Sequence, residues 1–394
     1  MNMKYSRALG ATGALVVLTG FVACSSATGE ASPAGGVDGD AAGADVSRSE
    51  VVDGTAPDGN AVVDASDSGD AGAEPCTADW CETPLPIPDG GKLTLMDVWV
   101  PAPNDAWAVS EEGLVLRWNG AQWAVVWDAH TPLYGVRGDH EGAIWLVGAA
   151  GAIFRGSNGA NWMPIPSGVT TDLMGICEGA RDAEHVKNIA IVGVASTVLR
   201  WTGDTSGDGK PLWDVSTFGP TEELYSISCQ GTDVWVSGTE TDWWEGGGRI
   251  YRHDGTSWTA QSGASEGNRY EVYHSIWVQD PKSIWLRGKG TIARSIPADD
   301  GVTLNWEQEL SGSPVDIKRP STIWASGPND VWIASSHGRV HHWDGSAIKV
   351  TITAKSWDVL NNNLHSVSGS GPDDVWVVGD NIALRRNVQN KGQD

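Results

Sequence analysis

Short apolar runs alternate with Gly-, Asp- and Asn-rich turns along most of this chain. The phrase ASGPNDVWIASSH (325–337) returns in closely similar form as GSGPDDVWVVGDN (369–381). In each copy a run of four to six mostly apolar residues follows a Gly-Pro turn, which is typical of a short buried β-strand. Helix-period segments of useful length are absent from the sequence. The pattern therefore predicts an all-β chain with a repeated unit.

The unit occurs seven times. Its central position is occupied by Trp107, Trp145, Ala190, Trp235, Trp285, Trp332 and Trp376, at intervals of 38 to 50 residues. A period in this range indicates a repeat architecture. Since Trp buries about 200 Å², we expect this Trp column to pack between neighbouring repeats.

Three further strands flank the Trp strand in each unit. Usually nine residues earlier lies an apolar strand that ends at Val98, Val136, Ile176, Ile227, Ile276, Ile323 or Val367. An alternating strand such as LVLRW (114–118) or IALR (382–385) comes after it. The fourth strand begins at Trp123, Trp162, Trp213, Trp258 or Trp306, commonly after a turn such as WNGAQW or HDGTSW. Asn-Gly and Asp-Gly favour tight hairpins, so the unit is four antiparallel strands.

Seven such units predict a seven-bladed β-propeller. The blades are expected to begin at about residues 95, 133, 173, 224, 272, 320 and 364 of a domain spanning 76–387. The last blade lacks a fourth strand, whereas DWCETPLPIP (79–88) matches NWMPIPSG (161–168) near the other end. Residues 80–88 are therefore predicted to close the ring as the outer strand of the last blade, which leaves no open edge.

The DVWxVG and WDGxxW elements of these blades resemble a family of secreted bacterial propeller lipoproteins. More loosely, they resemble the Asp-box (BNR-type) repeats of sialidase-type propellers. The resemblance covers residues 80–387 and implies the fold, since the matched residues are structural and a fold does not define a function.

An Arg recurs on the third strand of nearly every unit, namely Arg117, Arg155, Arg200, Arg252, Arg294 and Arg385. One interpretation is an anion-binding cluster. Because a residue present in most blades makes the same contact each time, we favour pairing with Asp105, Asp233, Asp330 or Asp374, or stacking on Trp.

The composition of the chain limits the classes of partner that it can bind. The 394 residues carry 22 Trp against 3 Phe and a net charge of −24. Such an acidic chain is not expected to bind nucleic acid, which needs a clustered basic surface. No later run resembles a transmembrane span, and we expect a monomer without a cofactor.

The first 24 residues are typical of a secretion signal, with Lys4 and Arg7 before an apolar segment. Val22-Ala23-Cys24 resembles a bacterial lipobox, which implies lipidation of Cys24; a plain secretory signal is the alternative. Ser25 resembles an outer-membrane sorting residue. We therefore expect an outer-membrane lipoprotein that faces the periplasm or the exterior, with the membrane contacted only through the lipid.

Residues 25–75 and 388–394 have compositions that do not form a core. Residues 25–75 are rich in Ala, Gly, Asp and Ser and lack aromatic residues, so they are predicted to be a disordered acidic linker. Residues 388–394 form a polar tail.

Four Cys remain, an even number for an oxidising compartment. Cys76 and Cys81 are predicted to close a small loop, and Cys177 and Cys229, taken as equivalent places in neighbouring repeats, to bridge adjacent strands. Free thiols are the alternative for the second pair. No metal site is predicted beyond one weak calcium candidate, Asp204, Ser206 and Asp208, which lacks the Glu that completes such a loop.

The residues that break the repeat are the candidates for binding. In TETDWWEGGG (239–248), Trp243 and Trp244 have no counterpart in other blades, and Asp242 and Glu245 flank them. Together with Tyr270 they are predicted to lie on one loop face and to contact a sugar or a protein partner. Packing of the two Trp against the rim is the alternative.

Two functions follow from this pattern. The first is a non-catalytic binding or scaffold propeller for a glycan or protein partner. The alternative is a carbohydrate-active enzyme, a glycoside hydrolase or polysaccharide lyase, with its site in the central funnel. No catalytic residue can be assigned from the sequence.

Overall fold

The described part of the chain consists almost entirely of β-strands. The computed structural model describes residues 76–87, 91–179, 188–201, 203–241, 246–264, 271–289, 291–297, 304–311, 322–352 and 362–388. Within these ranges the 28 strands form seven sheets of four strands each. The one helical element described there is a single 3₁₀ turn, Ala149–Gly151. None of the helical structure described could cross a membrane.

Each of the first three sheets uses four consecutive strands, and we call each sheet a blade. Blade 1 contains β2 (Leu95–Ala102), β3 (Asp105–Ser110), β4 (Leu114–Trp118) and β5 (Trp123–Asp128). Blade 2 contains β6 (Leu133–Gly138), β7 (Ala143–Gly148), β8 (Ile153–Ser157) and β9 (Ala160–Pro164). Blade 3 contains β10 (Leu173–Glu178), β11 (Ile189–Gly193), β12 (Thr197–Trp201) and β13 (Asp214–Thr217).

The remaining blades follow the same order until the last. Blade 4 contains β14 (Glu222–Gln230), β15 (Asp233–Glu240), β16 (Gly247–His253) and β17 (Trp258–Gln261). Blade 5 contains β18 (Tyr273–Asp280), β19 (Ser283–Gly288), β20 (Thr291–Pro297) and β21 (Leu304–Ser311). Blade 6 contains β22 (Ile323–Gly327), β23 (Asp330–Ala334), β24 (Arg339–Trp343) and β25 (Ile348–Ile352). Blade 7 contains β26 (Leu364–Gly371), β27 (Asp374–Gly379), β28 (Ile382–Arg386) and β1 (Trp80–Glu82).

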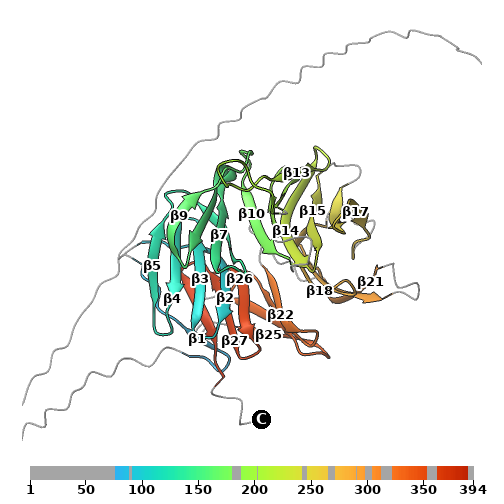
Figure 1. The fold of residues 1–394 in the computed structure, drawn as a ribbon. Helices are drawn as coiled ribbons and strands as arrows, with labels where there is room; N and C mark the ends of the chain where they lie inside the picture. Colours follow the sequence, from blue (N-terminus) through green and yellow to red (C-terminus); the bar gives the residue numbers. More distant parts are fainter. Residues whose placement is uncertain are drawn as a thin grey trace, which may run out of the picture. The chain divides into compact units, whose positions relative to one another are not determined.

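The blades form a closed ring. Each blade's first strand, its inner strand, contacts the inner strand of the next blade, and β26 of the last blade contacts β2 of the first. These contacts can be followed in Figure 1, where β26 lies beside β2. The chain is a seven-bladed β-propeller, as the repeat predicted. The inner strands run past the residues at which the sequence pattern ended them, for example to Ala102 in β2, because the residues beyond still pair with the second strand, as Ala102 does with Asp105.

The N-terminal strand closes the ring, as predicted. Strand β1 pairs antiparallel with β28, with Trp80 opposite Arg386 and Cys81 opposite Arg385. The strand is shorter than the predicted 80–88: it ends at Glu82, and Thr83 makes a last pair of bonds to the carbonyl of Ala383. Pro84 and Pro86 follow, and proline has no N–H with which to extend the ladder.

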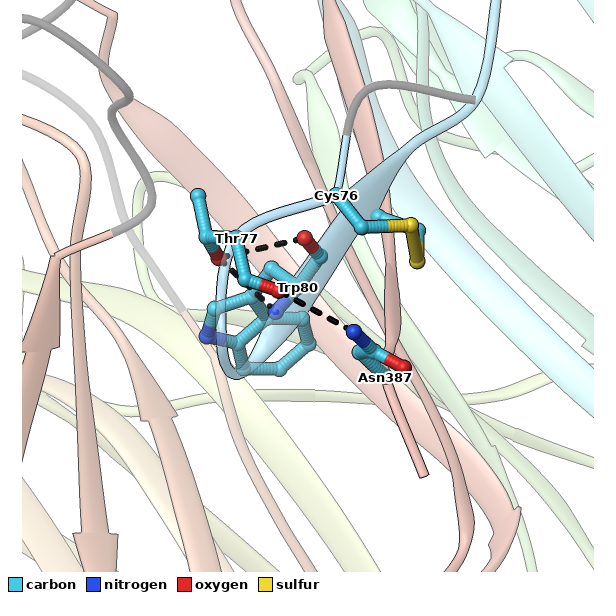
Figure 2. The surroundings of a disulfide bond; sticks show 5 residues. Cys76, Thr77, Trp80 and Asn387 are labelled. Atoms are coloured by element: carbon cyan, nitrogen blue, oxygen red, sulfur yellow. Dashed lines mark hydrogen bonds between the residues drawn. A yellow bond between two sulfur atoms is a disulfide. The ribbon is translucent and has the colours of Figure 1, made fainter. Parts of the chain in front are cut away.

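A disulfide stands at the start of this closing strand (Figure 2). Cys76 and Cys81 are bonded, which confirms the predicted pair. Inside the loop the Thr77 hydroxyl accepts the Trp80 N–H at 3.0 Å. The Asn387 side-chain amide donates to the Thr77 carbonyl at 3.0 Å. The loop therefore joins both ends of the domain at the same point.

Tryptophan fills the interfaces between blades, which we call seams. Trp145, Trp235, Trp285 and Trp376 are at most 2% exposed. The ring centroids of Trp118 in blade 1 and Trp376 in blade 7 are 5.1 Å apart, and those of Trp201 in blade 3 and Trp145 in blade 2 are 5.6 Å apart. The predicted packing of the Trp column between blades is confirmed.

The repeated Arg residues make structural contacts. Arg117 binds Asp105 at 2.9 Å and lies over the Trp107 ring at 4.8 Å. Arg252 with Asp233 and Trp235, and Arg385 with Asp374 and Trp376, repeat this arrangement. In blade 6 a histidine takes the place of Arg: His342 binds Asp330 at 2.7 Å and stacks on Trp332.

Removal of the closing Trp should open the ring. Trp80 is 1% exposed, packs edge-on against Trp332 at 5.6 Å and donates to Thr351 at 3.1 Å. Trp80→Ala is expected to lower the free energy of unfolding by about 3–5 kcal/mol, measured by urea denaturation. Glu82→Ala, at the exposed end of the same strand, is the matched control and should change it little. Equal stabilities for the two variants would contradict the closing role.

Candidate functional site

A channel runs between the inner strands of the seven blades. Its cavity measures about 830 Å³ and is lined by residues of β2, β6, β10, β14, β18, β22 and β26. The side chains here differ from blade to blade, unlike the Trp and Arg of the outer strands. The channel is therefore the described region in which the repeat gives way to individual chemistry.

Arg137 of β6 stands in the channel wall between two carboxylates. Within the described chain no hydrogen bond or ion pair engages its guanidinium, although Asp97 and Glu178 act on it through space. Burial lowers the pKa of Arg137, and the two carboxylates oppose that effect. All the N–H donors of Arg137 are thus available to a ligand.

The carboxylates around Arg137 already have partners. Asp97 accepts the N–H groups of Val98 at 2.9 Å and Val136 at 3.0 Å, and the Ser366 hydroxyl at 2.7 Å. Burial raises the pKa of Asp97, and these bonds oppose the increase. Glu178 accepts the main-chain N–H of His140 at 3.1 Å and contacts its ring. Both carboxylates therefore hold neighbouring blades together.

One position of the inner strand lies opposite the Trp column, its side chain reaches across the seam in several blades, and its chemistry changes around the ring. It is occupied by Trp99, Arg137, Cys177, Ser228, Trp277, Trp324 and Ser368. The Trp99 ring covers Gly138 of blade 2, where a Cβ would come within 1.9 Å of it. The Trp324 ring covers Gly369 of blade 7 in the same manner. Ser228 accepts the N–H of Val278 of blade 5 at 3.0 Å.

At the third seam, between blades 3 and 4, a covalent bond joins the two inner strands. Cys177 and Cys229 form a disulfide with a Cα–Cα distance of 5.6 Å, which confirms the predicted pair. The two Cys are not at equivalent places, contrary to the sequence interpretation: Cys177 pairs with Ala190 of the Trp column, whereas Cys229 pairs with Val234, one residue before Trp235. The offset is required because the side chain from one blade must meet the next residue of its neighbour across the seam.

An uncompensated positive charge lies at the fifth seam, between blades 5 and 6. Arg287 of β19 is 1% exposed, and its Nη1 and Nη2 atoms have no hydrogen-bond partner among the residues that the structure describes. Burial lowers its pKa to about 9. Burial and then the nearby Arg287 lower the pKa of His274, which lines the channel, and of His341 to about 4. Both imidazoles are therefore neutral at physiological pH.

The residues that the sequence singled out for binding lie outside the described residues. They are Asp242, Trp243, Trp244, Glu245 and Tyr270, and the lipidation candidate Cys24 lies outside them as well. The strands β15 and β16 that flank the loop end at Glu240 and begin at Gly247.

The calcium candidate forms a hydrogen-bonded turn. Asp208 contacts the Ser206 hydroxyl and binds Lys210 at 3.0 Å, which lowers the pKa of Asp208 to about 2. Asp204 uses its main-chain carbonyl to accept from Trp201 and Leu212. In the described ranges no three His, Cys, Asp or Glu residues gather in a way that could hold a metal ion.

Comparison with known proteins places the fold and no more. Neither a protein-family model nor a curated protein sequence matches the chain. Among solved structures it is similar to YCF48 from Cyanidioschyzon merolae, at 16% identity and a TM-score of 0.56, over 78% of this chain and 98% of that one. YCF48 bound to D1 peptide is similar at 15% identity and a TM-score of 0.56, over 79% and 95%. The extracellular domain of a putative hybrid two-component system, BT4673 from B. thetaiotaomicron, shares 12% identity at a TM-score of 0.57, over 80% and 42%.

Sequence reasoning did not find Arg137, Glu178, His274 or Arg287. A signal exists for three of them: Arg137, Glu178 and Arg287 each replace a small or apolar residue at their position in the other blades, whereas His274 has a counterpart in His365 of blade 7. This signal can be recognised once the seven blades are aligned by the pairing of the inner strand with the second strand.

The two neutral histidines predict an acid-sensitive ring. An unfolded His titrates near pH 6.5, so between about pH 6.5 and 4 the unfolded state binds more protons, and stability falls as the pH drops through this window. The loss from His341 should be about 1–3 kcal/mol, measured by urea denaturation at pH 7 and pH 4.5. His341→Asn should reduce the pH dependence.

The control for that experiment is His130→Asn. His130 is an 84% exposed side chain at a positive φ of 53°, which Asn tolerates. This change should leave the pH dependence as in the wild type. A His341→Asn variant with an undiminished pH dependence would show that His341 is not held neutral.

Proposed function

We propose that this chain is a non-catalytic binding propeller whose central channel takes a segment of a partner protein. The observation that carries the proposal is the free Arg137 guanidinium in a cavity of about 830 Å³ at the centre of the ring. Ligand pockets commonly measure about 300–1,000 Å³. The channel is therefore large enough for several residues of an extended chain.

The lining supports a peptide over a sugar. Met96 and Met174 supply adaptable apolar contacts, and Arg137, Gln230 and Gln279 supply polar groups for carbonyl and carboxylate oxygens. The rings of Trp99 and Trp324 are laid across the seams, where they cover glycine residues. A similar propeller, YCF48, has been solved bound to D1 peptide.

The carboxylates in the channel wall favour binding over hydrolysis. Asp97 and Glu178 hold neighbouring blades through hydrogen bonds, and Asp139 accepts from Ala143 at 2.8 Å and Trp145 at 2.9 Å. A glycosidase needs two carboxyl groups directed at a substrate. A carbohydrate-active enzyme is the second candidate function and is tested alongside.

The proposal includes the position of the protein in the cell. Lipid on Cys24 holds the ring at the outer membrane, and residues 25–75 separate the two as a tether. A ring so placed reaches partners in the envelope without entering the bilayer itself. The lipobox Val22-Ala23-Cys24 and the signal-like residues before it support this part of the proposal.

Selection from a displayed random-peptide library on the full chain tests the function. We expect retained peptides to bind at least tenfold more weakly to Arg137→Gln, because this change removes the free guanidinium. Lys349→Ala, on the outer strand β25, is the control and should bind them as the wild type does. Peptides that bind all three proteins equally, or no retained peptide at all, would contradict binding in the channel.

Two parallel measurements separate the alternatives. Release of reducing ends from a polysaccharide panel would replace the binding function by the enzymatic one. Peptide binding that is lost in a Trp243→Ala/Trp244→Ala double variant and unaffected by Arg137→Gln would move the site to the loop that contains those Trp residues.

A further inference from the structure

A second set of cross-seam contacts lies next to the channel. In five seams a side-chain oxygen on one inner strand accepts a main-chain N–H of the next inner strand. The pairs are Asp97 with Val136 (3.0 Å), Ser226 with Ile276 (3.2 Å), Ser275 with Ile323 (3.2 Å), Thr322 with Val367 (2.8 Å) and Ser366 with Val98 (3.3 Å). We call this set the seam caps. They satisfy N–H groups that have no strand partner on the channel side.

In the described part of the chain, two seams lack a cap. The residues in the capping position there are Gly135 and Gly175, and the N–H groups they face belong to Ile176 and Ile227. Ile176 pairs with Ile191 and Ile227 with Val236, the same register by which Val98 pairs with Ala108 and Ile276 with Leu286. The shared register directs both N–H groups away from the ladder, as in the capped blades.

The two uncapped positions, which we call gaps, differ in how much room they leave for a side chain. A Cβ on Gly135, which is buried, would come within 2.8 Å of Val147 of its own blade and 3.4 Å from Gly175 and Ile176 of the next blade, so that position has no room for a larger residue. A Cβ on Gly175 would make ordinary contacts, at 3.4 Å with Ile227 and 3.5 Å with Val192. Gly175 and Ile227 are both partly exposed and line the channel. Only the gap at Gly175 therefore opens into the cavity.

We propose that the main-chain N–H of Ile227 is a binding group of the channel and takes a carbonyl oxygen of the bound peptide. The ligand supplies the acceptor that a side chain supplies in five other seams. The surroundings of this N–H, which include Val192 and the Cys177–Cys229 disulfide, are apolar and suit a neutral acceptor better than a charged one. The disulfide also fixes the two blades that form the gap. This inference rests on the proposed function.

A hydroxyl at position 175 should replace the ligand. Gly175 has no positive φ, so Ser can be placed there without backbone strain. In Gly175→Ser the new hydroxyl is expected to accept the Ile227 N–H and to raise the melting temperature by about 2 °C. The same change should weaken peptide binding about tenfold. A more stable protein with a weaker site is an outcome that simple damage to the fold does not produce.

Gly175→Ala is the matched control, because it adds the same Cβ without an acceptor. The probe is N-acetyl-trialanine N-methylamide, titrated into the full chain labelled with ¹⁵N-isoleucine. We expect it to shift the Ile227 amide resonance in the wild type and in Gly175→Ala, and to shift it about tenfold less readily in Gly175→Ser. Equal loss in both variants would assign the effect to steric blocking and overturn the proposal. An Ile227 resonance that the probe leaves unchanged in the wild type would overturn it as well.

The two proposals fail separately. Library peptides that depend on Arg137 and bind Gly175→Ser at full strength would overturn the Ile227 site and leave the proposed function in place. A probe that shifts Ile227 while no library peptide is retained would support the site and contradict the function proposed for the channel.

Discussion

Most main-chain hydrogen bonds in this protein run within blades. A few cross a seam, such as those from Thr322 N–H to the His365 carbonyl and from Leu364 N–H to the Ser335 carbonyl, so side chains make most of the contacts that join one blade to the next. Each inner strand has one edge without a strand partner, and each blade presents its Trp column to a neighbour. The ring therefore depends on packing across seven seams. Rings such as Trp118 against Trp376 supply most of the apolar contact, and the seam caps satisfy the polar groups that the packing would leave without partners.

The need to join blades through side chains explains why some positions are the same in several blades and others differ from blade to blade. The Asp–Arg–Trp contact on the second and third strands performs one structural role, and the same three residue types make it in blades 1, 4 and 7. The cross-seam position of the inner strand needs only to reach its neighbour, and Trp, Arg, Cys and Ser all do so. Residues that are free to vary structurally, and that face a shared cavity, are available for recognition. Arg137 and the gap at Gly175 both belong to this class.

The sequence predicted the ring because its signals are local and repeated. Trp107 and its counterparts lie at a regular spacing, the turns are readable as Asn-Gly and Asp-Gly, and the match between residues 79–88 and 161–168 identified the missing strand. The length of that strand was overestimated, since Pro84 and Pro86 end the ladder. The channel was not predictable in the same way. Arg137 and Glu178 are 41 residues apart in sequence, and the packing of blade 2 against blade 3 places them on one wall. Gly175 stands where other blades have a capping residue such as Ser226 or Ser275. Its importance cannot be recognised from the sequence until the hydrogen bonds made by those serines are known.

The position of β1 has a consequence for how the protein comes to be folded. Trp80 is among the earliest residues of the domain to be synthesised, and its partner Arg386 is among the last. The first strand must therefore wait, unpaired and with a large aromatic side chain, until all the other strands exist. Pairing over so long a sequence separation is slow. The nascent chain thus carries an apolar strand end that other proteins can reach for most of its synthesis, and ring closure is the step that removes it from competition with aggregation.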